Sequence, residues 1–271
     1  MCTAAFASCA CTAPAQQTFY DRFRAHNAQM ASVQPTWMGP LIQPDSRLTQ
    51  SARLSLSNSY TAAGTRTVSY GNYHTLGLIA GNRIQVNLMA PPYVENNSAG
   101  VKDGFGDAMV EMKYRMASGN ADHGNFALTP MLCYSLPTGS HQNGAATGVY
   151  YPTLAAGKMW GRFDVQSTLG GTLPAGKIAE QGRSIEWNTT AQVLARARLW
   201  IDVEDNAIFN YGGTIDGRIE NFVTPAVFYV VRRKEWKPTH PVFVVDAGMQ
   251  IATTAFHTYN HDLIAEMRIL F

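Results

Sequence analysis

Long hydrophobic runs are missing from this sequence of 271 residues. No stretch approaches the ~18 consecutive apolar residues that a membrane-spanning helix requires, so any crossing of a membrane must be made without helices. Charge is also scarce, since Asp, Glu, Lys and Arg make up 15% of the residues, against roughly 25% in typical soluble domains. The formal net charge of +2 is small, and the one basic run is Arg232-Arg233-Lys234. These features predict no nucleic-acid partner.

Cysteine is sparse as well. The cysteines are Cys2, Cys9, Cys11 and Cys133, and their spacing matches no zinc or redox motif. His257 and His261 are too far apart along a strand to share a metal ion. We therefore expect no metal and no cofactor.

The first residues, MCTAAFASCACTAPA, are small and end in Ala13-Pro14-Ala15. Residues 1–15 resemble the last part of a secretion signal, with cleavage after Ala15. The alternative is a lipoprotein-type site at Phe6-Ala7-Ser8-Cys9, although Phe is a poor residue three positions before the cysteine. Both interpretations predict export from the cytosol.

Residues 16–48 show no regular period and carry Pro35, Pro40 and Pro44. The run QQTFYDRFRAHNAQM favours a short helix near the start of this segment. We expect residues 16–48 to form a periplasmic or plug-like segment that precedes the main domain.

From Thr49 to Phe271 the sequence alternates between polar and apolar residues. In FGDAMVEMKYRM, Asp107, Glu111 and Lys113 fall on one face and apolar residues fall on the other. Such alternation is typical of β-strands with two different faces. About twelve runs show it, near 49–60, 69–80, 83–90, 105–116, 125–135, 148–159, 161–172, 185–199, 201–211, 218–232, 241–252 and 261–271.

Alternation alone also suits a soluble sandwich or a lipocalin-like barrel. Strand length favours a different architecture, because most runs reach the roughly 9–11 residues of a membrane-spanning strand. Charges recur in mid-strand, where burial in a dry core would be prohibitive. Since a sheet in lipid must close to pair its edges, residues 49–271 are predicted to form an all-β, closed, antiparallel, up-and-down transmembrane barrel.

In such a barrel the polar row of each strand faces the lumen. The predicted lumen-lining residues are Arg53, Arg83, Asp107, Glu111, Lys113, Arg115, Arg162, Asp164, Glu186, Arg196, Arg198, Asp202, Glu204, Glu220, Asp246, Glu266 and Arg268. The charges near 186–204 suit either a structural ion-pair ladder or a constriction with acidic and basic walls. The inward rows near 222–244 are apolar, which suits a passing hydrophobic substrate or a plug equally well.

Particular motifs resemble a known family. Asn87-Leu88-Met89-Ala90-Pro91-Pro92, GFGDAMVEMKYRM at 104–116 and the terminal strand are similar to the transporter-like barrels of the MetA-pathway of phenol degradation family. This resemblance covers 49–271 and implies a barrel in the bacterial outer membrane. The terminal row Met267, Ile269 and Phe271 resembles the targeting strand that the barrel-assembly machinery recognises, which implies that machinery as a partner.

The expected function is therefore a monomeric outer-membrane channel or transporter for small molecules, hydrophobic and aromatic ones included. Its expected partners are the lipid bilayer and a small solute, and no catalytic residue is predicted. A structural or adhesion-type closed barrel is the first alternative. The second is a lipid-modifying enzyme that uses Ser140 and His141 in the loop GSHQNG, although the residue order departs from the phospholipase pattern.

Overall fold

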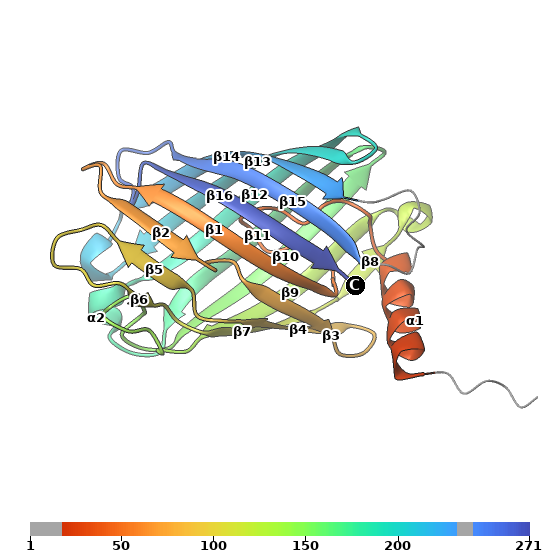
Figure 1. The fold of residues 1–271 in the computed structure, drawn as a ribbon, viewed down its shortest axis with the longest axis horizontal. Helices are drawn as coiled ribbons and strands as arrows, with labels where there is room; N and C mark the ends of the chain where they lie inside the picture. The colour runs from red at the N-terminus through yellow and green to blue at the C-terminus, as the bar shows by residue number, and fades with distance from the viewer. Residues whose placement is uncertain (1–17, 232–240) are drawn as a thin grey trace, which may run out of the picture.

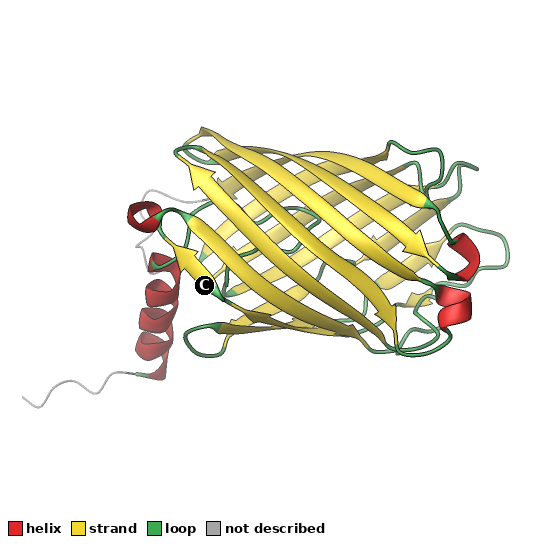
Figure 2. Ribbon diagram, turned by 180° about the vertical axis from the view of Figure 1, so that it is seen from behind, coloured by secondary structure: helices red, strands yellow, loops and turns green. Residues whose placement is uncertain are grey.

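The computed structural model describes residues 18–231 and 241–271, and it shows one closed barrel with a helix across one end (Figures 1 and 2). The helix is α1 (Phe19–Ser32), inside the run where the sequence predicts one. Three short helical turns lie in the loops: η1 (Ala121–His123), α2 (Ile178–Gln181) and η2 (Gly213–Ile215). The strand segments are β1 (Ser51–Tyr60), β2 (Arg66–Tyr70), β3 (Thr75–Ile79), β4 (Ile84–Met89), β5 (Tyr93–Asn96), β6 (Gly104–Phe105), β7 (Met109–Tyr114), β8 (Ala117–Gly119), β9 (Phe126–Ser135), β10 (Val149–Trp160), β11 (Phe163–Pro174), β12 (Arg183–Arg196), β13 (Leu199–Tyr211), β14 (Ile219–Val231), β15 (Val242–Ala252) and β16 (His261–Leu270).

These segments form 12 spanning strands, because three of the strands are interrupted. β2 and β3 both pair with β1, so they are two parts of one strand, and β4 with β5 and β6 with β7 and β8 are related in the same way. Each strand pairs antiparallel with its sequence neighbour. β16 pairs with β1 from Ser51↔Leu270 to Tyr60↔His261, which closes the sheet. The predicted twelve-stranded, closed, antiparallel barrel is confirmed.

The predicted run at 69–80 is not continuous. Four residues, 71–74, separate β2 from β3 opposite only Leu54 and Ser55 of β1. Gly71 adopts a φ of 100°, which favours glycine, and the Tyr73 amide donates to the Ser55 hydroxyl at 2.8 Å. The bulge directs the Tyr73 ring toward the Arg53 guanidinium, 5.4 Å away.

The two faces of the sheet have opposite character. On β16, Leu263 is 49% exposed and Met267 is 37% exposed, whereas Glu266 and Arg268 are 6% and 7% exposed. Exposed side chains are thus apolar and buried ones charged, which inverts the arrangement of a soluble protein. An apolar outer belt on a closed sheet is the solution that lipid imposes, because every backbone polar group is paired within the sheet. Among the described residues, the helices are all too short or too polar to span a bilayer.

The two ends of the barrel differ in their links. The end that carries α1 and the C-terminus has the short turns 80–83, 161–162 and 197–198 (Figure 1). The opposite end has the longer loops 97–103, 136–148, 175–182, 212–218 and 253–260. In outer-membrane barrels the short turns lie in the periplasm and the long loops outside, and among the described links the shorter turns are at the α1 end.

Candidate functional site

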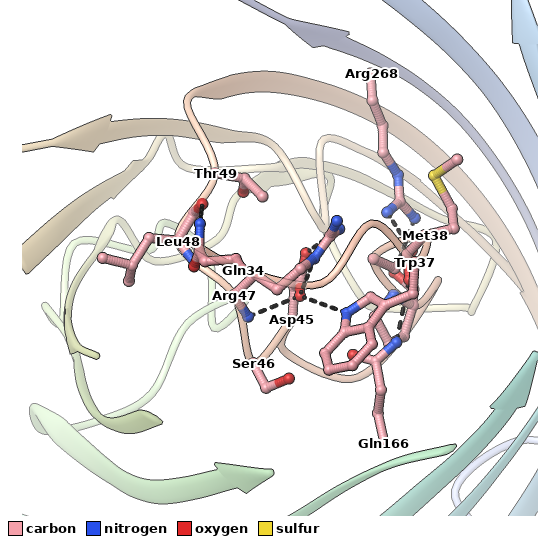
Figure 3. Close-up of polar contacts among 12 residues, drawn as sticks. Gln34, Trp37, Met38, Asp45, Ser46, Arg47, Leu48, Thr49, Gln166 and Arg268 are labelled. Carbon is pink, nitrogen blue, oxygen red and sulfur yellow. Dashed lines mark hydrogen bonds and ion pairs between the residues drawn. The ribbon is translucent and has the colours of Figure 1, made fainter. Parts of the chain in front are cut away.

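The chain enters the barrel after α1. Residues 34–50, which we call the lumen segment, lie inside the lumen (Figure 3). Trp37 and Leu41 are 2% and 0% exposed, and they pack against Phe228 and Val244 of the wall. The apolar inward rows of β14 and β15 therefore contact the lumen segment in this structure.

Two wall glycines make room for this packing. A Cβ atom on Gly157 would lie 2.7 Å from the Trp37 ring, and one on Gly248 would lie 2.5 Å from the Leu41 side chain. Either distance is far below van der Waals contact, so these positions accept the lumen segment only as glycine. The wall is thus shaped to receive it.

The turn at 39–43 is bound to one wall by a carboxylate. Both oxygens of Glu204 accept backbone N–H groups, from Ile42 and Gln43 at 3.0 Å and from Leu41. Glu204 is completely buried on β13. Hydrogen bonds to an ionised acceptor are roughly twice as strong as neutral ones, so this carboxylate is the main contact of the turn with that wall.

The carbonyl groups of the same turn meet arginines of the facing strands. Arg268 donates to the carbonyl oxygens of Gly39 and Pro40 at 2.6 and 2.8 Å, and Arg53 donates to that of Leu41. Both guanidinium groups are paired with the Glu266 carboxylate, at 2.6 Å for Arg53 and 3.1 Å for Arg268. The amide groups of the turn therefore bond a carboxylate on one wall, and its carbonyl groups bond guanidinium groups on the other.

The second half of the lumen segment is ordered by Asp45. Its carboxylate pairs with Arg47 at 2.8 Å and accepts the Trp37 indole N–H at 3.4 Å, while Lys113 of β7 donates to the carbonyl oxygens of Asp45 and Arg47 at 2.5 and 2.7 Å. Burial alone would raise the pKa of Asp45, but the charges of Arg47 and Lys113 outweigh burial and lower that pKa to about 2. Asp45 is therefore ionised at every physiological pH.

Further polar contacts tie the lumen segment to the wall along its length. Gln34 and Leu48 exchange hydrogen bonds at 3.0 and 2.7 Å within the segment. The Thr49 amide donates to Gln85 at 2.6 Å, and Gln166 donates to the Met38 carbonyl at 3.1 Å. Gln85 lies on β4 and Gln166 on β11, so separate parts of the wall hold the two ends of the segment.

The lumen is not filled. A cavity of about 750 Å³ lies beside the lumen segment and reaches from Asn27 and Phe271 at the α1 end to Tyr151 and Glu186. A second cavity of about 210 Å³ lies toward the loop end. The two share Ile42, Gln43 and Pro44 as lining residues. The turn held by Glu204 thus borders both spaces.

Two wall carboxylates of the larger cavity have only neutral hydrogen-bond partners among the described residues. Glu111 accepts from the Asn87 amide at 2.5 Å. Glu186 accepts from the hydroxyls of Thr172 and Ser184 at 2.9 and 3.1 Å. These two carboxylates thus differ from Glu266 and Asp246, which are paired with Arg53 and Arg268.

The residues predicted to line the lumen fall into two groups. Most lie inside the barrel and are buried or half-buried: Arg53, Asp107, Glu111, Lys113, Arg115, Asp164, Glu186, Asp202, Glu204, Glu220, Asp246, Glu266 and Arg268. Some of these face loops rather than open space. Asp107 accepts amide N–H groups of Thr138, Gly139 and Ala145 in the loop 136–148, and Glu220 accepts from Thr258.

Four of the predicted residues lie elsewhere, namely Arg83, Arg162, Arg196 and Arg198. They occupy the short turns of the α1 end or their edges, where Arg83, Arg162 and Arg196 are exposed. The alternation in the sequence predicts that Arg196 and Arg198 face inward. In the structure the register of β12 shifts between Leu194 and Arg196, where the strand ends, so these two arginines lose the inward orientation. Arg162 instead donates to the Ala195 carbonyl at 2.6 Å and joins two turns.

The polar residues of the lumen segment were missed as site residues, because 34–50 has no periodic signal. Its cluster of prolines with Trp37 was the one sign in the sequence that this stretch is packed. The predicted terminal row lies as expected on the outside: Met267 and Phe271 are 37% and 38% exposed and Ile269 is half-buried.

Among the described residues, Ser140 and His141 do not form the catalytic pair that a lipid-modifying enzyme would need. The Ser140 hydroxyl oxygen accepts the Phe105 amide at 2.8 Å, and His141 is exposed. Within residues 18–231 and 241–271 no hydrogen bond joins Ser140 to His141, and no cluster of His, Cys, Asp and Glu there could hold a metal ion. His257 binds Thr254 and Asn260 instead.

Comparisons with known proteins identify the fold. No protein-family model matches the sequence, and no curated protein matches it. The COG4313 outer membrane channel from Pseudomonas putida F1 superposes with a TM-score of 0.60 at 12% identity, over 87% of this chain and 100% of that one. The NanC porin gives a TM-score of 0.52 at 7% identity, over 80% and 98%. This chain has the fold of the β-barrels that form outer-membrane channels.

Proposed function

We propose that this protein is an outer-membrane channel for small molecules, in which residues 16–48 act as a plug. The observation that carries the proposal is the cavity of about 750 Å³ that runs beside the lumen segment from the α1 end toward the loops. A closed barrel built only for adhesion needs no such space. The fold shared with the COG4313 channel and the NanC porin supports the same function.

The lining of the cavity favours small solutes with an apolar part. Trp37, Met89, Met109 and Tyr151 line it together with the carboxylates described above. Apolar and aromatic side chains with a few placed polar groups are typical of sites for small organic molecules. We therefore propose hydrophobic and aromatic compounds as the substrate class, which agrees with the resemblance of 104–116 to the MetA-pathway family.

The remaining parts of the proposal follow from the architecture. The apolar outer belt requires a bilayer, and the terminal row Met267, Ile269 and Phe271 would be the signal for the barrel-assembly machinery. A complete barrel that closes on itself needs no second copy, so the working unit is a monomer. The protein would act by passage and not by catalysis.

Solute uptake tests the function. Proteoliposomes that contain the protein should take up small aromatic compounds faster than empty vesicles, and faster than a sugar of similar mass. Heat-denatured protein in the same vesicles is the control. Uptake equal to that of empty vesicles for every solute would leave the structural or adhesion-type barrel as the better account.

A further inference from the structure

The helix α1 lies across the end of the barrel rather than inside it. Its long axis is roughly perpendicular to the barrel axis, and its N-terminal end reaches past the edge of the barrel (Figures 1 and 2). Since the barrel axis crosses the bilayer, a helix in this position runs parallel to the membrane plane. Its first turns stand over the region that lipid occupies.

Among residues 18–231 and 241–271, the hydrogen bonds between α1 and the barrel come from the second half of the helix. His26 bonds the Gly81 carbonyl at 3.2 Å, Asn27 donates to the Phe271 carbonyl at 3.1 Å, and Arg115 donates to that of Met30 at 3.3 Å. The N-terminal end is instead stabilised by its own capping box, in which Thr18 and Asp21 bond each other's backbone amide groups. The capping hydrogen bonds of the first turn are thus made within the helix itself.

One face of α1 continues the lipid-facing surface of the barrel. At 3.6 residues per turn, Phe19, Phe23, Asn27 and Met30 share one side of the helix. Asn27 and Met30 rest on the barrel end, so Phe19 and Phe23 point the same way beyond it. The Phe23 ring stacks on Phe271 with centroids 6.4 Å apart, and Phe19 stacks on Phe23 at 6.3 Å. Phe271 is the last residue of the outward row of β16, so this aromatic ladder begins on the lipid belt.

The residues around the ladder suit the boundary between headgroups and acyl chains. Phe19 is 78% exposed and Tyr20 is 57% exposed. Two adjacent aromatic side chains with this exposure are unusual on a surface that faces only water. Arg22 and Arg24 flank the same face, and Arg24 lies over the Tyr20 ring at 5.3 Å. Aromatic residues with flanking arginines are characteristic of helices that lie in a membrane interface.

From these observations we infer that the N-terminal half of α1 is a membrane-interface anchor that binds the phospholipid headgroup layer at the periplasmic end of the barrel. Phe19, Tyr20 and Phe23 insert at the acyl boundary, and Arg22 and Arg24 bind phosphate groups. The helix holds the start of the lumen segment against the barrel mouth. This role goes beyond the proposed channel, because it requires only that the barrel is in a bilayer.

Nitroxide labels at single cysteines test the inference. In a chain whose native cysteines are replaced by serine, Phe19→Cys places a label on the ladder face and Ala25→Cys places one on the opposite, exposed face. In phosphatidylethanolamine and phosphatidylglycerol vesicles, the label at 19 should be relaxed more by oxygen than by a polar nickel complex. The label at 25 should show the reverse order.

A third label separates this inference from the channel proposal. Leu169 on β11 is 57% exposed on the outer belt, so Leu169→Cys should report oxygen-rich lipid whenever the barrel is inserted. Oxygen preference at 169 with nickel preference at 19 would overturn the interface role and leave the barrel intact. Nickel preference at 169 would show that the barrel is not in lipid, and it would overturn both.

Discussion

At the scale of single residues, the lumen is organised by charges that bind backbone groups of the lumen segment. Glu204 accepts three consecutive amide groups of the turn at 39–43, and Arg53 and Arg268 take its carbonyl groups. Each hydrogen bond to a charged group contributes about 1.5–3 kcal/mol. The packing of Trp37 and Leu41 on the wall is thus supplemented by a few strong polar contacts, and the loss of one of them weakens the hold on the turn.

Asp45 yields a prediction on pH. The pKa of its carboxyl is about 2, below its ordinary value of 3.8, so its stabilising contribution is complete above pH 3.8 and is lost as the pH falls through 2. Asp45→Asn should therefore raise channel conductance above that of the wild type throughout pH 7 to 4. The difference should shrink as the pH approaches 2, which planar-bilayer recordings at stepped pH would measure.

A difference between the two proteins that disappeared already near pH 6 would contradict this assignment of the charge. A substitution at Lys113 is the second variant to compare, because Lys113 donates to the backbone carbonyl groups of Asp45 and Arg47. Lys113→Met should also raise conductance at neutral pH, and because the Lys113 charge helps to lower the pKa of Asp45, its pH dependence should begin at a higher pH than that of the wild type.

At the scale of elements, the sequence predicts strands well and irregular segments poorly. Apolar residues such as Leu263, Met267 and Phe271 alternate with charged ones because lipid and lumen lie on opposite sides of β16. This alternation can be read directly from the sequence. The break at 71–74 and the end of β12 at Arg196 carry no such signal, since a bulge shifts the register without changing composition. The interior path of 34–50 depends on contacts with distant strands, which only the folded chain brings together.

The terminal strand gives a prediction on assembly. Phe271→Ser should lower the amount of heat-modifiable barrel in the outer-membrane fraction several-fold, because it removes the last residue of the proposed targeting row. The gel shift between unboiled and boiled samples measures folded barrel directly.

Phe23→Ser separates targeting from packing. It also abolishes the stack between Phe23 and Phe271, yet it leaves the terminal strand unchanged. Normal assembly of Phe23→Ser with poor assembly of Phe271→Ser would support the targeting role. Equal loss in both variants would assign the effect to the stack instead.

At the scale of the whole molecule, closure of the barrel explains the unusual composition. Charges are few because the outer face must be apolar, and charges buried in the lumen, such as Glu204, Glu266 and Arg268, bond each other or the lumen segment. The architecture could be predicted from strand length and alternation, since both are imposed by the bilayer on every strand. Whether the lumen is free could not be predicted, because the apolar rows of β14 and β15 suit a substrate and a plug alike.

The most direct test of the central claim, a channel whose lumen segment limits passage, is the single-channel conductance of Glu204→Gln in planar bilayers. The substitution keeps the size of the side chain but places an amide group against the backbone amides of 41–43. A loss of about 1.4 kcal/mol in the free energy that holds the lumen segment would raise the fraction of barrels with a released segment tenfold. Glu220→Gln is the matched control, because Glu220 is also buried, on the neighbouring strand, but binds Thr258 in a loop. We expect low conductance for the wild type and Glu220→Gln and about tenfold more open time for Glu204→Gln. Assembled Glu204→Gln barrels that conduct no more than the wild type would contradict the central claim.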